Sequence, residues 1–284
     1  MKKLFFILTN LVILTACGDK GGDKNKDYIV NINTSYGDMK VILYEETPLH
    51  KKNFLELAKS GRFDSTIFHR VINEFMIQGG NVYEKEGTQE PQNARIPSEI
   101  NPKLFHKKGE LAAARQGDQV NPNRMSSSCQ FYIVHGKVYK EEELTVDQFK
   151  LNQAISEMLQ KEEYQDLYNQ FVELQRARNI QGMNDLAFQY KEECEKVMGV
   201  ELDKEFDPER LAAYTSIGGT PHLDDQYTVF GRVVEGLDVV DKIAAVQTKP
   251  GDRPVEPIHM TVSVEQVKKK KITKEYGYVY PETK

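Results

Sequence analysis

The chain has 284 residues, of which 39% are hydrophobic and 29% carry a charge. This length exceeds that of one ordinary compact domain, and the composition can fill a substantial core, so we expect one globular domain with additional segments. The net charge of −5 provides no basic field, and the lysines at 268–271 are too few to create one, which argues against nucleic acid as a partner.

The first 16 residues have the pattern of a bacterial lipoprotein signal peptide. Lys2 and Lys3 precede an apolar run from Leu4 to Ala16. The run is shorter than the ~20 residues needed to cross a bilayer, and it ends in small residues, as signal peptides do. By resemblance to lipoproteins, Cys17 is the expected lipid attachment site. We therefore expect an exported protein, lipid-anchored through Cys17 to a bacterial envelope membrane, with an ordinary secretory signal as the alternative.

Residues 17–27 follow as a polar segment rich in Gly, Lys and Asp. Because this segment has almost no apolar side chain to bury, we expect a flexible tether between the anchor and a folded domain. We assign the folded domain to residues 28–267 and a charged, solvated C-terminal tail to residues 268–284.

The folded segment contains short runs of β-favouring residues separated by turn residues. Strands are expected at residues 28–33, 38–43, 66–71, 74–78, 109–114, 130–134, 228–234 and 260–267. Thr47 as N-cap and Pro48 as first residue predict a helix that ends at Gly61, and a second helix is expected at residues 237–246. Together these elements predict a mainly β fold, an eight-stranded closed antiparallel barrel capped by two helices, because closure removes exposed strand edges.

Residues 137–218 have a different character, because polar residues dominate and apolar residues recur at helical spacing. We expect an amphipathic helix or helical hairpin between residues 146 and 172, an interruption at Gly182, a helix capped by Asn184, and a short helix from Asp207-Pro208. The segment is far longer than the usual ~4–6 residues between elements. It is therefore predicted to be an inserted α-helical segment with its own structure.

The cysteines and histidines give few constraints. Beyond Cys17, Cys129 falls at an expected core strand and Cys194 in an expected helix. An exported protein could pair them, but the sequence does not set the distance between them, so this disulfide stays open. The six histidines lack the spacing of metal ligands, and we expect neither a metal nor a cofactor.

Arg70 is the most informative residue of the chain. It lies in the first of two apolar, strand-like runs at residues 68–72 and 75–80. A guanidinium is always charged, so its position among apolar side chains is unfavourable unless it has a partner. The partner is either structural, with Gln78, Gln130 and Glu74 as candidates, or it is a bound substrate.

Four blocks occur in one order: Phe68-His69-Arg70-Val71-Ile72, Phe75-Met76-Ile77-Gln78-Gly79-Gly80, Cys129-Gln130-Phe131-Tyr132-Ile133 and Val229-Phe230-Gly231. In these blocks the chain resembles the cyclophilin family of peptidyl-prolyl cis-trans isomerases, from residue 28 to about residue 267 with the insertion excluded. The resemblance implies the family's fold, an eight-stranded antiparallel barrel capped by two helices. It also implies an isomerase of X-Pro bonds that needs no cofactor.

The resemblance further assigns roles to individual residues. Arg70 matches the catalytic arginine, and Gln78 is its polar companion. The substrate-binding positions are Phe75, Met76, Ala114, Arg115, Gln130, Tyr132, His222, Leu223 and Tyr227. Side chains alternate along a strand, so Met76 and Gln78 share a face, and Phe131 points away from Tyr132. The insertion begins after residue 134 and ends just before Leu223, so it should lie at the rim of this groove.

Three positions depart from the family pattern. Tyr132 replaces the usual phenylalanine and brings a hydroxyl to the proline pocket, which could lower activity. Tyr227 replaces a histidine, and His222 replaces a tryptophan that supports cyclosporin binding in relatives, so strong binding of that drug is in doubt.

These observations lead to an isomerase that acts on X-Pro bonds of unfolded or newly exported envelope proteins. Twisting the bond frees the proline nitrogen's lone pair, so a donor such as Arg70 would stabilise the transition state selectively. The expected partners are proline-containing peptides, unfolded proteins and, through Cys17, a membrane. The alternative is a non-catalytic client-binding or chaperone module that uses the same groove and the inserted helices.

Overall fold

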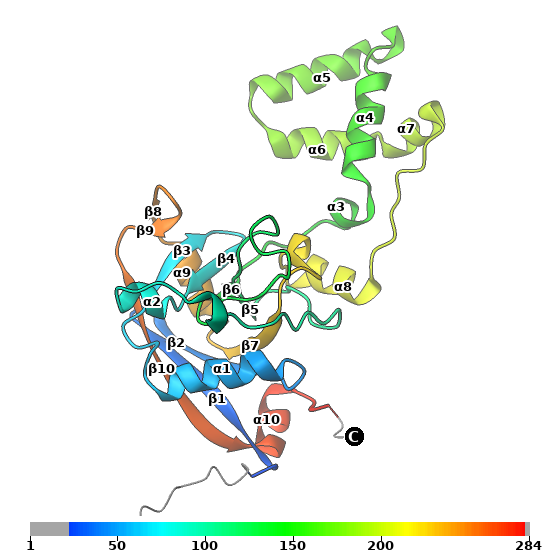
Figure 1. The fold of residues 1–284 in the computed structure, drawn as a ribbon. Helices are drawn as coiled ribbons and strands as arrows, with labels where there is room; N and C mark the ends of the chain where they lie inside the picture. Colours follow the sequence, from blue (N-terminus) through cyan, green and yellow to red (C-terminus); the bar gives the residue numbers. More distant parts are fainter. Residues whose placement is uncertain (1–22, 282–284) are drawn as a thin grey trace, which may run out of the picture.

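The computed structural model describes residues 23–281, and its main body is a closed barrel of antiparallel strands (Figure 1). The order around the barrel is β1-β10-β3-β4-β6-β5-β7-β2. The strands are β1 Lys26–Thr34, β2 Gly37–Leu43, β3 Ile67–Ile72, β4 Met76–Gly79, β5 Glu110–Ala113, β6 Phe131–Val134, β7 Val229–Glu235 and β10 Ile258–Lys268. A separate sheet pairs β8 (Thr248–Lys249) with β9 (Arg253–Pro254). The predicted eight-stranded closed barrel is confirmed.

Side chains alternate between the inside and the outside of the barrel, as strand geometry requires. Val30 of β1 and Phe131 of β6 belong to a large buried cluster inside. Their chain neighbours Ile29 and Tyr132 belong to a second cluster, which therefore lies on the outer surface. The predicted separation of Phe131 from Tyr132 is thus observed.

Two helices contribute to the inner cluster and close the barrel. They are α1 (Pro48–Lys59) and α9 (Leu237–Ala244), which bury Phe54 and Val240 in it. Thr47 occupies the N-cap position and Pro48 the first turn, as expected, but the Thr47 side chain makes no capping hydrogen bond. Instead, the free N–H groups of the helix start donate to the carboxylate of Glu99, which is distant in the sequence.

Short helical turns lie in the connections. The turns α2 Val82–Lys85 and η1 Gln92–Ala94 lie between β4 and β5, η3 Pro221–Leu223 precedes β7, and η2 Glu162–Tyr164 lies in the helical insertion. Between β3 and β4, Glu74 has a φ of 59° and belongs to a turn, so β4 begins two residues later than expected.

The C-terminal segment packs against the barrel, in contrast to the solvated tail that we expected. Helix α10 (Lys269–Tyr276) buries Ile272 completely, and Tyr278 is also buried. The Tyr278 hydroxyl accepts a hydrogen bond from the Glu45 N–H and donates one to the Glu46 carboxylate, both at 2.9 Å. The prediction of a solvated tail was based on the four lysines and did not consider the apolar residues that follow them in the sequence.

The insertion consists of two parts (Figure 1). Helices α3 (Glu141–Thr145) and α8 (Pro208–Ser216) form its base beside the barrel, where Leu144 and Tyr214 pack on Phe105. Residues 147–203, which we call the arm, stand away from the barrel. The arm contains α4 Gln148–Met158, α5 Gln165–Arg176, α6 Ile180–Gln189 and α7 Lys191–Met198.

The arm has its own hydrophobic core and a narrow connection. Leu151, Met158 and Cys194 are fully buried in this core. The two chain segments of the connection run antiparallel, and the Asp147 N–H donates to the Leu202 carbonyl at 2.8 Å. The arm is therefore a small helical unit that two antiparallel chain segments join to the base.

Two of the expected helix starts can be compared directly with the structure. Asp207 caps α8 by accepting a hydrogen bond from the Arg210 N–H at 2.9 Å, as expected. The cap of α6 is Asn179, whose side chain accepts from the Gly182 N–H at 2.9 Å. The assignment of Asn184 as a cap is therefore wrong, and Gly182 lies inside the helix.

Cys129 and Cys194 are both buried and free, so the disulfide left open by the sequence is absent from the described part of the chain. Within residues 23–281, no helix has the length and apolar character to cross a membrane. The predicted signal peptide, Cys17 and the first part of the tether lie outside the described residues.

Candidate functional site

A cavity of about 100 Å³ opens on the outer surface of the barrel. We call it the pocket. Its lining consists of Arg70, Phe75, Met76, Gln78, Ala114, Arg115, Tyr132, Leu223 and Tyr227. All nine are site residues predicted from the sequence. The other two, Gln130 and His222, contact the lining residues rather than the cavity itself.

The strand register explains why distant residues meet at the pocket. Arg70 of β3 pairs with Gln78 of β4, and Gln78 pairs with Tyr132 of β6. Directly paired residues on neighbouring strands point to the same face of a sheet. The cation, the amide and the aromatic ring therefore lie in one row across three strands.

The apolar residues that flank Arg70 in the sequence suggested a buried side chain, but 42% of the Arg70 side chain is exposed. Its partner is Asp252, whose Oδ2 atom lies 3.2 Å from the Arg70 Nε. None of the three structural partners considered from the sequence binds it. Asp252 follows Gly251 in the turn between β8 and β9, and nothing local in the sequence connects it to β3.

Gln78 and Gln130 are joined by a hydrogen bond. The Gln78 Nε2 donates to the Gln130 Oε1 at 3.1 Å, which fixes the orientation of both amides beside the pocket. The Gln130 carbonyl also accepts from the Ala114 N–H at 3.0 Å. Gln130 therefore holds both a lining side chain and the lining backbone.

Ala114 and Arg115, at the edge of the pocket, differ in whether their backbone groups have hydrogen-bond partners. Ala114 uses its N–H for Gln130 and its carbonyl for the Ser127 N–H. Across the described residues, the backbone N–H and carbonyl of Arg115 have no hydrogen-bond partner. Arg115 is therefore the residue of this segment whose backbone can pair with a bound peptide.

Aromatic contacts hold the outer wall of the pocket. The Arg115 guanidinium lies 4.5 Å from the centre of the Tyr227 ring, a favourable cation–π geometry. The His222 ring stacks on Phe75 at 5.3 Å. Burial is the main cause that lowers the pKa of His222, so this ring is neutral at pH 7 and contributes mainly packing.

Tyr132 is buried and its hydroxyl has a specific partner. Its oxygen lies 2.9 Å from the His106 Nε2, and His106 in turn contacts Asp224. Burial raises the pKa of Tyr132 well above its ordinary value, so the hydroxyl keeps its proton. His106 and Asp224 were not predicted, because their importance depends on contacts between segments far apart in the sequence.

The described residues contain no group of three or more His, Cys, Asp or Glu side chains that could hold a metal. The polar side chains that line the pocket are those of Arg70, Gln78, Arg115, Tyr132 and Tyr227, beside an apolar wall.

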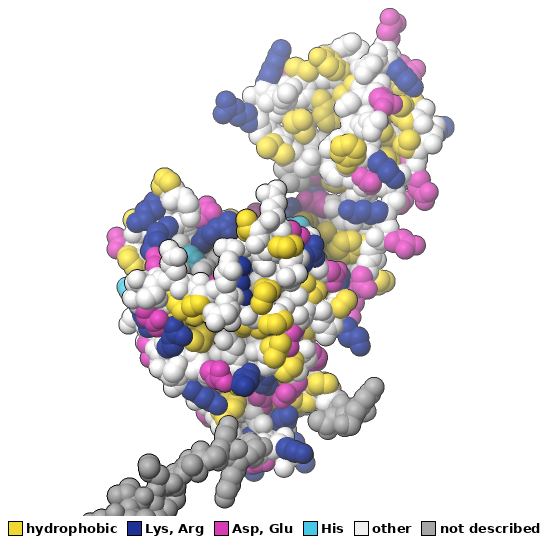
Figure 2. Space-filling view, in the orientation of Figure 1, with side chains coloured by type: hydrophobic (Ala, Val, Ile, Leu, Met, Phe, Trp, Pro, Cys, Tyr) yellow, Lys and Arg dark blue, Asp and Glu magenta, His cyan; other side chains and the backbone are white. Residues whose placement is uncertain are grey.

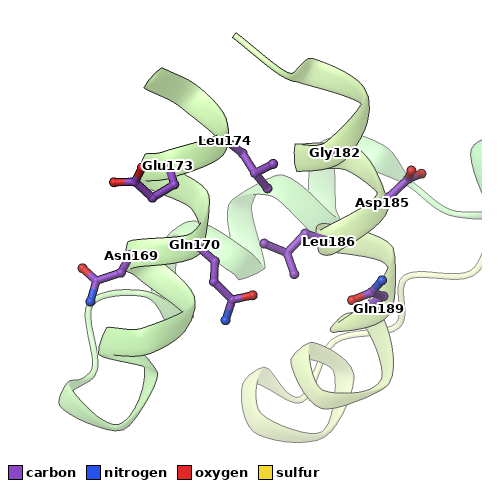
Figure 3. Close-up of a pocket in the computed structure, with 8 residues that line it drawn as sticks. All are labelled: Asn169, Gln170, Glu173, Leu174, Gly182, Asp185, Leu186 and Gln189. Carbon is purple, nitrogen blue, oxygen red and sulfur yellow. The ribbon is translucent and has the colours of Figure 1, made fainter. Parts of the chain in front are cut away.

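A second and larger groove, of about 490 Å³, lies in the arm between α5 and α6. Leu174 and Leu186 point into the space between the two helices, whereas Glu173 and Asp185 lie toward its edges (Figure 3). No residue of the barrel lines this groove.

Known proteins resemble this chain in the segments that form the barrel. A family model described as "Cyclophilin type peptidyl-prolyl cis-trans isomerase/CLD" matches residues 29–151 and 212–265. The unmatched residues between these segments make up most of the arm, which agrees with an insertion into the barrel.

Two curated relatives illustrate the sequence likeness. A "Putative bifunctional phosphatase/peptidyl-prolyl cis-trans isomerase" of Streptococcus pyogenes is 30% identical over 81% of this chain, but the match spans only 37% of that longer protein. A "Putative peptidyl-prolyl cis-trans isomerase" of Staphylococcus saprophyticus is 27% identical, and the match covers 80% of this chain and 86% of the relative.

Solved structures give weaker likenesses. A cyclophilin type peptidyl-prolyl cis-trans isomerase of Cryptosporidium parvum is 20% identical with a TM-score of 0.49, and the match covers 84% of this chain and 96% of that one. The same isomerase was also solved in the presence of the dipeptide Ala-Pro. At such scores the family model and the observed barrel topology, rather than these structures, establish the fold.

Proposed function

The chain belongs to the cyclophilin-type peptidyl-prolyl cis-trans isomerases, and from this premise we propose that it isomerises X-Pro bonds in the pocket, with Arg70 as the catalytic donor. One observation carries the role of Arg70. Its guanidinium lies in the same row as Gln78 and Tyr132 and lines a cavity beside Phe75.

The chemistry requires only selective stabilisation of a twisted amide. The barrier to rotation is ~18–20 kcal/mol because twisting breaks amide resonance. In the twisted state the proline nitrogen regains a lone pair that can accept a hydrogen bond, so a donor aimed at it lowers the barrier. Asp252 engages only the Nε of Arg70, which leaves the terminal Nη groups available for this role.

The remaining lining residues bind the substrate. Phe75, Met76 and Leu223 provide an apolar wall for the proline ring. Gln78 and the backbone of Arg115 are the polar groups available to the flanking peptide. Such binding orients the X-Pro bond against Arg70 and reduces the exposure of the reacting amide to water.

The decisive experiment is an exchange measurement on a Xaa-Pro peptide by NMR. We expect the wild-type protein to accelerate isomerisation and Arg70→Ala to lose ~10²-fold or more, which is typical for removal of one transition-state donor. Arg62→Ala is the matched control, because that arginine forms an exposed ion pair with Glu86 and does not line the pocket. Failure of the wild-type protein to accelerate exchange would overturn the proposal.

We further propose that the protein is exported, lipid-anchored at Cys17, and acts on unfolded or newly exported proteins of the envelope. The sequence pattern of residues 1–17 supports this setting. Mass spectrometry of the native N-terminus tests the anchor. A lipid on Cys17 that is lost in Cys17→Ser is expected, and an unmodified Cys17 in the mature protein would refute it.

A second candidate function is client binding by the arm, and its surface supports this role. Phe149 and Ile180 are 79% and 72% exposed, and Figure 2 shows hydrophobic side chains on the arm's surface. The insertion carries 18 acidic and 10 basic residues, so its net charge is −8 while that of the whole chain is −5. We propose that the groove between α5 and α6 binds unfolded client segments that carry apolar and basic side chains, since these complement its leucines and its acidic surroundings.

Charge variants can test this second function without altering the barrel. Gln170→Lys with Gln189→Lys adds two positive charges at the groove. Gln160→Lys with Gln175→Lys adds the same charge at exposed positions outside it. Suppression of aggregation of a reduced, denatured client should weaken only in the first variant, while isomerisation of a short peptide stays unchanged in both. Equal suppression by both variants would exclude the groove as the client site.

A further inference from the structure

A chain of buried hydrogen bonds connects the base of the insertion to the wall of the pocket. The Tyr214 hydroxyl of α8 donates to the Asp224 Oδ2 at 2.6 Å. The other carboxylate oxygen, Oδ1, lies 3.0 Å from the His106 Nδ1. On its opposite side, the His106 ring places Nε2 2.9 Å from the Tyr132 hydroxyl.

These groups are shielded from water, so each bond has few competitors. Tyr214 and His106 are fully buried, and only 6% of the Asp224 side chain is exposed. Asp224 also accepts from the His106 backbone N–H at 2.9 Å, and Arg210 of α8 lies 3.3 Å from its Oδ2. Such donors replace the hydrogen bonds to water that a carboxylate loses when it is buried.

The partners determine the direction of each hydrogen bond. The Asp224 carboxylate offers acceptor oxygens to the Tyr214 hydroxyl, to the His106 backbone N–H and to the His106 ring, so the ring proton that faces it is on Nδ1. In the tautomer with its proton on Nδ1, the Nε2 atom is an acceptor, and the Tyr132 hydroxyl donates to it. The proton of Tyr132 therefore points away from the pocket, and the wall that faces a proline ring remains apolar despite the hydroxyl.

We propose that Tyr214, Asp224 and His106 are positioning residues for the proline pocket, and that α8 of the insertion thereby sets the orientation of Tyr132. This inference rests on the proposed function, because the pocket is the site where that function places proline. Asp224 directly follows the lining residue Leu223, so the same carboxylate also holds a second part of the wall. The base of the insertion thus helps to form the substrate site, because α8 holds residues that line the pocket.

Tyr214→Phe provides the test, because it removes one hydroxyl and keeps the ring packed on Phe105 at 5.7 Å. We expect KM for a Xaa-Pro peptide to rise ~3–10-fold while kcat stays within ~2-fold, as for a loss of binding that is shared by ground and transition states. The matched control is Tyr139→Phe, since Tyr139 packs on Tyr214 but lies outside the hydrogen-bond chain. It should change neither constant.

A double-mutant cycle separates positioning from general damage. In a Tyr132→Phe background the last link is already absent, so Tyr214→Phe should raise KM by less than it does in the wild-type protein, because only the contribution through Leu223 remains. The same fold-change in both backgrounds would overturn the proposal. Arg210→Gln, at the edge of the chain of bonds, is the second variant if Tyr214→Phe does not fold.

Two measurements do not depend on turnover. Peptide affinity from an NMR titration should fall with Tyr214→Phe, and the ¹⁵N signals of His106 should report a proton on Nδ1 in the wild-type protein. A wild-type protein that binds peptide without isomerising it would refute the proposed function and leave this inference standing. A proton on Nε2 of the neutral His106 ring would refute this inference alone.

Discussion

The Nε atom of Arg70 lies 3.2 Å from the Oδ2 atom of Asp252, although 182 positions separate the two residues in the chain. A backbone hydrogen bond beside it, from the Val71 N–H to the Asp252 carbonyl at 2.8 Å, fixes the turn against β3. Both side chains are almost half exposed, so the ion pair adds only ~0–1 kcal/mol to stability. Its main consequence is the orientation of the guanidinium.

Asp252→Asn should therefore reduce activity more than stability. Asparagine tolerates the positive φ of 59° at this position, so the turn should remain while the charge is lost. We expect kcat/KM for a Xaa-Pro peptide to fall ~3–10-fold and the free energy of unfolding to change by less than ~1 kcal/mol.

Glu84→Gln is the matched control for Asp252→Asn. Its carboxylate pairs with Arg253 at 3.0 Å, and both of these side chains are 45% exposed. An unchanged or increased kcat/KM in Asp252→Asn would show that Asp252 does not orient Arg70 for the reaction.

Local strand and turn patterns were sufficient to predict the barrel, whereas the lining of the pocket was predicted from the resemblance of four sequence blocks to the cyclophilin family. Alternating strands place Phe131 and Tyr132 on opposite faces whatever lies elsewhere in the chain. Asp252, Asp224 and His106 could not be identified in this way. Each acts through contacts between distant segments, and isolated Asp or His residues in a sequence have many ordinary roles.

The contacts of the C-terminal helix and of the start of α1 could not be predicted from the local sequence either. These contacts matter for stability rather than for function. The lysines before Ile272 indicated a solvated segment, yet that residue is buried in the outer cluster, whose other members come from distant parts of the chain, such as Ile29 and Tyr44. Likewise, Thr47-Pro48 is a typical helix start, but a carboxylate from another segment, that of Glu99, takes the capping role.

Glu110 should make the folding stability depend on pH. Its carboxyl group is buried, and desolvation raises its pKa to about 7, although Lys107 and the hydrogen bond from Tyr44 oppose this shift. In the unfolded chain the pKa is about 4.5. Between these two values the folded state holds a proton that the unfolded state has released, so stability falls as pH rises from 4.5 to 7 and is constant above.

Glu110→Gln should abolish this decrease, because glutamine has no proton to lose and its carbonyl can still accept from Tyr44. The unfolding free energy of wild type relative to the variant should fall by about 3 kcal/mol between pH 4 and pH 8. Urea unfolding at both pH values measures it. The exposed Glu256→Gln is the control, and parallel pH curves for Glu110→Gln and wild type would contradict the prediction.

Gly136→Ala should destabilise the junction where the insertion leaves and rejoins the barrel. Gly136 has a φ of 64°, and a Cβ atom there would meet the backbone of Gly219. The adjacent Lys137 carbonyl accepts from the Gly219 N–H at 2.9 Å, so the two segments cannot move apart without loss of a hydrogen bond.

We expect Gly136→Ala to lower the free energy of unfolding by ~2 kcal/mol or more, measured by thermal or urea unfolding. Gly117→Ala is the matched control, since no atom lies within 4 Å of its added Cβ. A variant at Gly136 as stable as that at Gly117 would mean that the junction adapts without strain.

Ile272→Ala tests whether α10 is part of the folded domain rather than a tail. The Ile272 side chain is completely buried in the outer cluster that also contains Ile29 and Tyr44. Its truncation should reduce the free energy of unfolding by ~2–4 kcal/mol, since both transfer and cavity effects act at a buried site. Val279→Ala, at a side chain that is 76% exposed, should change it by less than ~0.5 kcal/mol. If the two variants are equally stable in urea unfolding, α10 is not part of the folded domain and the segment is the solvated tail expected from its lysines.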